Sequence, residues 1–334
     1  MKPTLPVAGL AALAITAAML WTLPERDEPD SAVAVSPALR AGSDQARSQQ
    51  AAPPGPEPDG ADVATEPDRA PSHAQAWPLY QRRQASEDLF ALAQSIHENA
   101  AAGDAASMWT LGQIYDACEL LAVKYGTAAT LDSARQSIDV VTAAMPPQAA
   151  RYHRRQFDRC RGFVEHPDQL ENAEIWQTLA AEAGHPAAQL RAWVDRRLDA
   201  DLGPPSLPRV ASLVESGQPD ALLLAPRLLR LDTQEAEPTA SAINETAWAL
   251  AACQLGVDCS DQGEITQIRC IWDACAPGDD VVTVLQGQVS PYVFQQARDQ
   301  ATRLAVAIRQ GRLDDAGLVH LRVNSSASGD AITQ

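Results

Sequence analysis

Residues 99–118 read NAAAGDAASMWTLGQIYDAC, and this stretch decides the fold class. A few large apolar residues recur among small ones at steps of three and four, the period of one helix face. The Gly-Asp pair at 103–104 interrupts the pattern and predicts a turn, because glycine past a helix end adopts the left-handed conformation cheaply. The stretch therefore predicts two closely packed helices joined as a hairpin.

Two further glycine turns repeat this signal, at AEAGHPAAQ (181–189) and VESGQPDAL (214–222). In each, a proline follows the glycine and suits the first turn of the next helix, where no backbone hydrogen bond is lost. A small side chain stands four residues after each of the three glycines and allows close packing: Ser107, Ala188 and Ala221.

Apolar periodicity predicts helices along most of the remaining chain after residue 76, and strand patterns are nearly absent. Residues 279–287 alternate weakly, and a short helix fits them equally well. We therefore expect an all-α fold of α-solenoid-like helical hairpins followed by a disulfide-stapled helical part. The expected helices span residues 88–101, 105–121, 131–144, 148–161, 168–183, 186–200, 207–216, 220–231 and 291–310, with another beginning at an Asn244 N-cap.

Residues 99–115 and 176–192 resemble the units of the Sel-type, tetratricopeptide-like helical repeat family. The resemblance covers about residues 86–231, although the third unit keeps only Gly217 and Ala221, and the second lacks the later Leu-Gly-x-x-Tyr. It implies a protein–protein interaction scaffold of the kind found in bacterial envelopes and regulatory assemblies. The matching positions are Ala100, Gly103, Leu111, Gly112 and Tyr115 in the first unit, and Trp176, Ala180, Ala181, Gly184, Ala188 and Leu190 in the second.

The N-terminus predicts export. Lys2 precedes an uncharged apolar run from residue 5 to 23, close to the length that crosses a bilayer as a helix. We expect residues 1–23 to be an uncleaved signal anchor, with a cleaved signal peptide as the alternative. The composition favours a bacterial inner-membrane protein whose folded part lies in the periplasm, or a secreted periplasmic protein after cleavage.

The expected organisation after the anchor has four parts. Residues 24–76 are rich in Pro, Ala, Gly, Ser and acidic residues and predict a disordered tether. A helical-repeat domain is expected at 77–231, a Cys-rich helical domain at 242–312 and a flexible tail at 313–334.

A net charge of −17 argues against nucleic-acid binding, which needs basic surface to displace counterions. It also argues against docking on anionic lipids, so membrane contact is expected only through the N-terminal segment.

The six cysteines of this expected exported chain predict disulfides. Their spacing is wider than most zinc knuckles, and no histidine lies among the last four, so a metal site is the less favoured alternative. Sequence cannot choose among three connectivities for these four. We favour Cys253 with Cys270 and Cys259 with Cys275, and we expect the remaining pair to be Cys118 with Cys160.

Three groups of residues have both a functional and a structural interpretation. The basic face formed by Arg151, Arg154, Arg155 and Arg159 suits an acidic partner, or is a solvated helix face. Asp279 and Asp280 suit a cation site or helix capping. Five tryptophans suit a groove or the core: Trp109, Trp176, Trp193, Trp248 and Trp272.

No nucleophile elbow, zinc-protease motif, phosphate loop or dinucleotide fingerprint occurs in the sequence. We therefore expect a scaffold that binds another protein or an envelope component, without a cofactor, metal or catalytic residue. The alternative is an exported hydrolase or cell-wall lyase. A cleft with two converging, desolvated carboxylates would favour that alternative.

Overall fold

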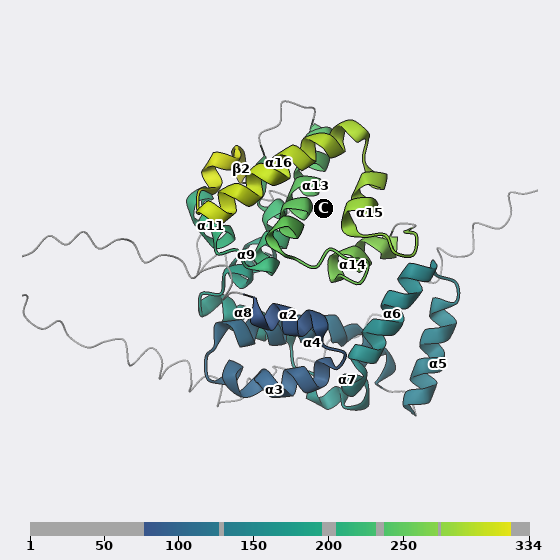
Figure 1. The fold of residues 1–334 in the computed structure, drawn as a ribbon. Helices are drawn as coiled ribbons and strands as arrows, with labels where there is room; N and C mark the ends of the chain where they lie inside the picture. Colours follow the sequence, from purple (N-terminus) through teal and green to yellow (C-terminus); the bar gives the residue numbers. More distant parts are fainter. Residues whose placement is uncertain (1–76, 127–129, 196–204, 232–236, 273–274, 322–334) are drawn as a thin grey trace, which may run out of the picture. The chain divides into compact units, whose positions relative to one another are not determined.

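The computed structural model describes residues 77–126, 130–195, 205–231, 237–272 and 275–321 (Figure 1). The expected anchor and tether, residues 1–76, lie outside this range. Within it the regular secondary structure is helical except for one pair of short strands, so the all-α prediction is confirmed.

The helices of the first part begin with α2 (Pro78–Ala85), α3 (Leu89–Ala101), α4 (Ala105–Tyr125), α5 (Leu131–Thr142), α6 (Pro147–Arg159), α7 (Arg161–Glu165) and η2 (Pro167–Gln169). There follow α8 (Ala173–Glu182), α9 (Pro186–Asp195), α11 (Leu207–Glu215), α12 (Pro219–Leu224) and η3 (Ala225–Arg227). The second part contains α13 (Glu237–Leu255), α14 (Glu264–Trp272), α15 (Val281–Gln288), α16 (Pro291–Gln310) and η4 (Leu313–Ala316). The strands are β1 (Leu229–Leu231) and β2 (Leu318–Leu321).

The three glycine turns form as predicted. Gly103, Gly184 and Gly217 have φ angles of 100°, 87° and 68°, which a residue with a side chain rarely adopts. Asp104 then caps the first following helix, since its carboxylate accepts a hydrogen bond from the Ser107 backbone N–H at 2.9 Å. These turns pair α3 with α4, α8 with α9, and α11 with α12.

The hairpins also contact one another in chain order. Helix α4 packs along α8, and α9 packs against both α11 and α12. The close approach of α4 to α8 depends on Gly112, because a Cβ there would lie 2.7 Å from Gln177 Cγ and 3.1 Å from the Ala173 carbonyl oxygen. A glycine at position 112 thus sets the distance between these two hairpins.

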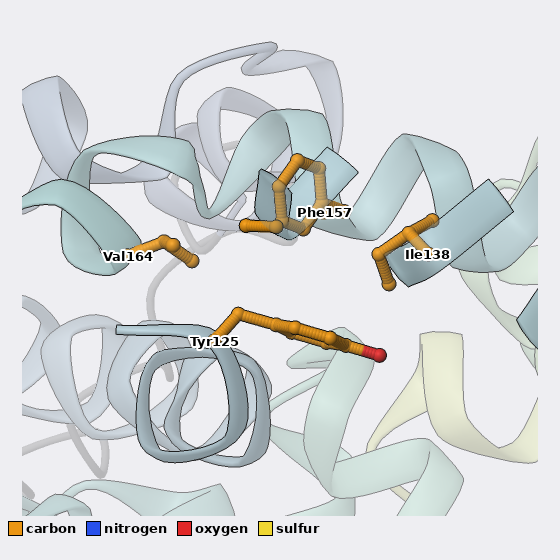
Figure 2. Close-up of a cluster of buried hydrophobic side chains, with 5 residues drawn as sticks. Tyr125, Ile138, Phe157 and Val164 are labelled. Carbon is orange, nitrogen blue, oxygen red and sulfur yellow. The ribbon is translucent and has the colours of Figure 1, made fainter. Parts of the chain in front are cut away.

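Helices α5, α6 and α7 close a separate apolar cluster over the end of α4. Figure 2 shows Tyr125 of α4 facing three apolar side chains. These are Ile138 of α5, Phe157 of α6 and Val164 of α7. The rings of Tyr125 and Phe157 meet edge to face with centroids 6.0 Å apart. The predicted 148–161 helix is divided here, because the chain turns at Cys160 between α6 and α7.

The disulfide prediction is correct for one pair and wrong for the other two. Cys118 and Cys160 are joined and tie α4 to the end of α6. The second part, however, contains Cys253–Cys259 and Cys270–Cys275 in place of the crossed pairs that we favoured. The chain turns back after α13 at Gly256, where φ is 110°, and this turn brings Cys259 to the end of the helix it has just left.

Three further expectations are corrected. Residues 229–231 form β1, not the end of a helix, and residues 313–321 of the expected tail form η4 and β2. The strands pair antiparallel, with Leu229 opposite Leu321. Asn244 is not an N-cap, because α13 begins at Glu237. Its buried amide instead donates to the Leu229 carbonyl oxygen at 3.1 Å and accepts from the Leu231 N–H at 3.0 Å.

Helices α13 and α16 lie side by side along much of their length (Figure 1). The ambiguous stretch 279–287 enters the helix α15 at Val281, and Asp280 caps this helix by accepting from the Thr283 N–H at 2.8 Å. Asp279 accepts from the Ala276 N–H at 2.7 Å, so both aspartates act in capping and turn formation.

Candidate functional site

A cavity of about 610 Å³ lies among α2, α4, α9, α12, η3, α13 and α14. Its volume falls within the roughly 300–1,000 Å³ of ligand pockets. Helices from both the hairpin part and the Cys-rich part therefore contribute to one site. Its walls combine charged, aromatic and aliphatic side chains, namely Tyr80, Arg83, Trp109, Gln113, Arg191, Asp220, Leu222, Leu223, Leu224, Pro226, Arg227, Glu245, Trp248, Ala249, Glu264, Ile265, Ile268 and Arg269.

The centre of the site is an arginine between two carboxylates. One guanidinium nitrogen of Arg83, Nη2, lies 3.3 Å from Asp220 Oδ1, and the other, Nη1, lies 3.2 Å from Glu264 Oε2. The side chains are 8%, 16% and 29% exposed, respectively. We call these three residues the ionic cluster.

Each member of the ionic cluster stands at a helix end that suits its charge. Arg83 lies in the last turn of α2, Asp220 in the first turn of α12, and Glu264 in the first turn of α14. Carboxylates are stabilised near the positive N-terminal end of a helix, and cations near the negative C-terminal end. The fold thus brings one C-terminus and two N-termini together at the cavity.

Asp220 has both of its oxygens engaged. Oδ1 pairs with Arg83, and Oδ2 accepts a hydrogen bond from Trp109 Nε1 at 2.7 Å. The indole of Trp109 in turn stacks on the buried ring of His185, with centroids 5.5 Å apart. This contact links the ionic cluster to the Gly184 turn between α8 and α9.

His185 is uncharged in this setting, because burial lowers its pKa to about 4 despite the opposing effect of Asp104. Its Nδ1 accepts a hydrogen bond from the Ala188 N–H at 3.4 Å, so the ring caps the start of α9. An acceptor at Nδ1 requires the tautomer that carries its proton on Nε2.

The two carboxylates have pKa values displaced in opposite directions. Burial raises the pKa of Asp220, and Arg83 and Trp109 offset this effect only in part. Burial also tends to raise the pKa of Glu264. Arg83, Gln84 and Arg159 together outweigh this effect, so the pKa of Glu264 is lowered. Burial opposes the charge of Arg83, yet Glu264 and Asp220 outweigh that effect and raise the pKa of Arg83. Arg83 therefore stays charged.

Arg159, expected on an exposed basic face, is instead a buried support of this site. Its Nε donates to the Ser86 carbonyl oxygen at 2.8 Å, and its Nη2 donates to the Arg83 carbonyl oxygen at 2.5 Å. It thereby holds the C-terminal end of α2, which carries Arg83. Burial lowers the pKa of Arg159, with Glu264 opposing this effect.

The other three arginines of the expected docking face are engaged within the chain. Arg154 pairs with Asp139 at 3.1 Å. Arg155 pairs with Glu87 at 3.2 Å and Arg151 donates to Gln148. The docking role of this face stays a prediction.

The tryptophans divide between the two expected roles. Trp109, Trp176, Trp193 and Trp248 are all at most 4% exposed, and Trp109 and Trp248 also contribute to the cavity wall. The side chain of Trp272 lies outside the described part.

Sequence reasoning did not find the ionic cluster. Arg83, Asp220 and Glu264 stand 137 and 44 residues apart in sequence, and no motif connects them. Each position carries a weak local signal at most, such as the acidic residue after Pro219. Only the packing of three helix ends reveals that they share one site.

Two negative findings apply to the residues that the structure describes. They contain no group of three or more His, Cys, Asp or Glu side chains placed to hold a metal ion. None of their helices combines the length and the apolar character that a membrane span requires.

The chain was compared with known proteins by family, by sequence and by structure. No protein-family model, no curated protein and no solved structure matches it.

Proposed function

We propose that this protein is a binding scaffold of solenoid-like helical hairpins that works outside the reducing cytosol and takes a segment of a partner protein into the cavity. The observation that carries the proposal is the cavity itself, which joins hairpin helices to the Cys-rich helices. In its polar centre, one arginine is held by internal ion pairs to two carboxylates. A site of this kind offers shape and apolar contact to a ligand without an evident catalytic group.

The compartment is supported by the cysteines. All six are joined in three disulfides, and such bonds persist in oxidising compartments. Together with the apolar run at 5–23, this favours a protein tethered to the inner membrane of a bacterial envelope and folded in the periplasm.

Site-specific photo-crosslinking of the full chain in its native membrane tests the proposal. A photoreactive amino acid at Ile268, which lines the cavity, is compared with one at Val306 on α16, which does not. Both residues are 43% exposed, so the two photoreactive groups are equally accessible from solvent. We expect one partner protein to be crosslinked at position 268 and absent at 306, with mass spectrometry identifying the crosslinked peptide. Equal yields at both positions, or none at 268, would contradict the proposal.

An exported hydrolase is the second candidate, because the cavity contains two desolvated carboxylates with pKa values displaced in opposite directions. That arrangement is typical of an acid–base pair. However, a general acid needs an oxygen free to carry the proton toward substrate, and both oxygens of Asp220 accept hydrogen bonds from protein donors. Cleavage of cell-wall or glycan substrates by the full chain, abolished in Glu264→Gln, would favour this candidate over the scaffold.

A further inference from the structure

The charged side chains that line the cavity outside the ionic cluster are mostly arginines. They are Arg191, Arg227 and Arg269, against the single carboxylate of Glu245. With the ionic cluster included, the lining has four arginines against three carboxylates, a local excess of one positive charge on a chain with a net charge of −17. Such a site favours an anionic ligand by charge complementarity.

The three arginines differ in how far they are engaged within the chain. Arg191 pairs with Asp195 one helical turn away, and Arg269 donates to Gln288 at 3.4 Å. Arg227 is exposed and has no hydrogen-bond or ion-pair partner among the described residues. A carboxylate that enters the cavity would therefore meet an uncommitted guanidinium at Arg227.

Aliphatic residues accompany these arginines on two walls. Arg227 follows Leu223 and Leu224 along α12 and η3. Arg269 follows Ile265 and Ile268 along α14. Each wall thus offers an apolar surface with a guanidinium at its end.

The carboxylates of the ionic cluster do not favour a cationic ligand. Asp220 already has an ion pair and an indole hydrogen bond, and Glu264 Oε2 accepts from Gln84 and pairs with Arg83. A lysine side chain at Asp220 would therefore compete with a buried internal cation, whereas an acidic side chain at Arg227 would gain a partner.

From these observations we propose that the cavity binds an acidic peptide segment of a partner protein, in which a carboxylate side chain lies beside aliphatic ones. The carboxylate pairs with Arg227, and the aliphatic side chains contact the walls formed by α12 and α14. This assignment rests on the proposed binding function and specifies the chemistry of the segment.

Fluorescence anisotropy with the full chain tests the assignment. The probes are a labelled, terminally blocked peptide of alternating leucine and aspartate, and its counterpart with lysine in place of aspartate. We expect only the acidic peptide to bind, with an affinity that falls as salt is added. Arg227→Glu should weaken binding about tenfold, because it replaces one attractive contact with a repulsive one.

Arg303→Glu is the matched control, since Arg303 is an exposed arginine on α16 away from the cavity. It changes the net charge equally and should leave the affinity unchanged, and circular dichroism checks that both variants stay folded. Equal weakening in both variants would overturn the assignment, since it would indicate attraction to net charge alone. Preferential binding of the lysine peptide would overturn it as well.

The outcomes separate this assignment from the proposed function. If neither peptide binds but position 268 still crosslinks one partner, the peptide chemistry is wrong and the scaffold stands. If position 268 crosslinks nothing and neither peptide binds, both proposals fail.

Discussion

Removal of Arg83 is the most direct test of the ionic cluster. In Arg83→Met, Asp220 and Glu264 lose the cation at 3.3 and 3.2 Å while staying largely buried. With an effective dielectric constant of about 20, each pair at such a distance contributes roughly 5 kcal/mol of Coulomb attraction. The variant also no longer has to desolvate the Arg83 guanidinium, and this offsets much of the lost Coulomb attraction. Removal of one partner from a buried ion pair therefore lowers the unfolding free energy by about 3–5 kcal/mol. Because Glu264 keeps 29% of its side chain exposed, we expect a loss at the lower end, about 3 kcal/mol.

The pH dependence of the loss follows from the pKa displacements. In the natural protein the lowered pKa of Glu264 contributes stability that is present above its ordinary pKa and is lost as the pH falls. Without Arg83, burial raises the pKa of both carboxylates, so protonation then favours the folded state. The difference in unfolding free energy should therefore be largest near neutral pH and should narrow as the pH falls through the carboxylate range.

Urea denaturation followed by circular dichroism at several pH values measures this difference. Arg82→Met is the matched control, because Arg82 is the exposed neighbour, and its one side-chain hydrogen bond within the described ranges goes to Ser95 at 3.3 Å. Its unfolding free energy should stay within about 0.5 kcal/mol of the natural protein. An Arg83→Met loss below about 1 kcal/mol, or one that is independent of pH, would refute the buried ionic cluster.

Three further predictions concern stability. Gly112→Ala should lower the unfolding free energy by about 1–3 kcal/mol, because the added methyl group overpacks the α4–α8 contact. Gly287→Ala, where a Cβ meets nothing within 4 Å, should be neutral or stabilising by up to about 1 kcal/mol. Urea denaturation compares the two variants, and equal effects would contradict the close approach of α4 to α8. Replacing Cys118 and Cys160 together by alanine should cost about 4 kcal/mol in the chain-entropy model, because the disulfide closes a sequence separation of 42 residues; an unchanged thermal midpoint would argue against this bond. Burial lowers the pKa of His185 to about 4 in the folded protein, so the unfolded state binds this proton first and stability should decrease as the pH falls from about 6.5 to 4. His185→Asn should flatten that part of the profile of unfolding free energy against pH. A natural protein with no slope there would exclude a neutral buried histidine.

The features that the sequence predicts well are local. The turns at Gly103 and Gly184 and the helices that flank them depend on residues within one or two helical turns of each other. A left-handed glycine and an adjacent capping residue determine such a turn without distant contacts. This is why each hairpin could be predicted from a short stretch around its own glycine.

The errors concern partners that the local sequence does not specify. Asn244 is a good N-cap in isolation, but in the fold its amide pairs with the backbone of β1. The cysteine pairing depends on where the chain turns, and the turn at Gly256 joins near neighbours, whose loop closure costs the least entropy. The ionic cluster is the extreme case, because it brings together three helix ends that are distant in sequence.

The position of α14 links stability to the proposed function. Its fully buried side chains include Thr266 and Cys270, while its aliphatic residues Ile265 and Ile268 line the cavity and are not fully buried. A helix that leaves its isoleucines partly uncovered gains little from the hydrophobic effect and needs other attachments. The chain provides them as a disulfide in the turn that precedes α14, a disulfide at its C-terminal end, and the ion pair of Glu264 in its first turn. Covalent and ionic attachment thus substitutes for apolar burial, which is the arrangement expected of a wall that must keep apolar surface available to a ligand.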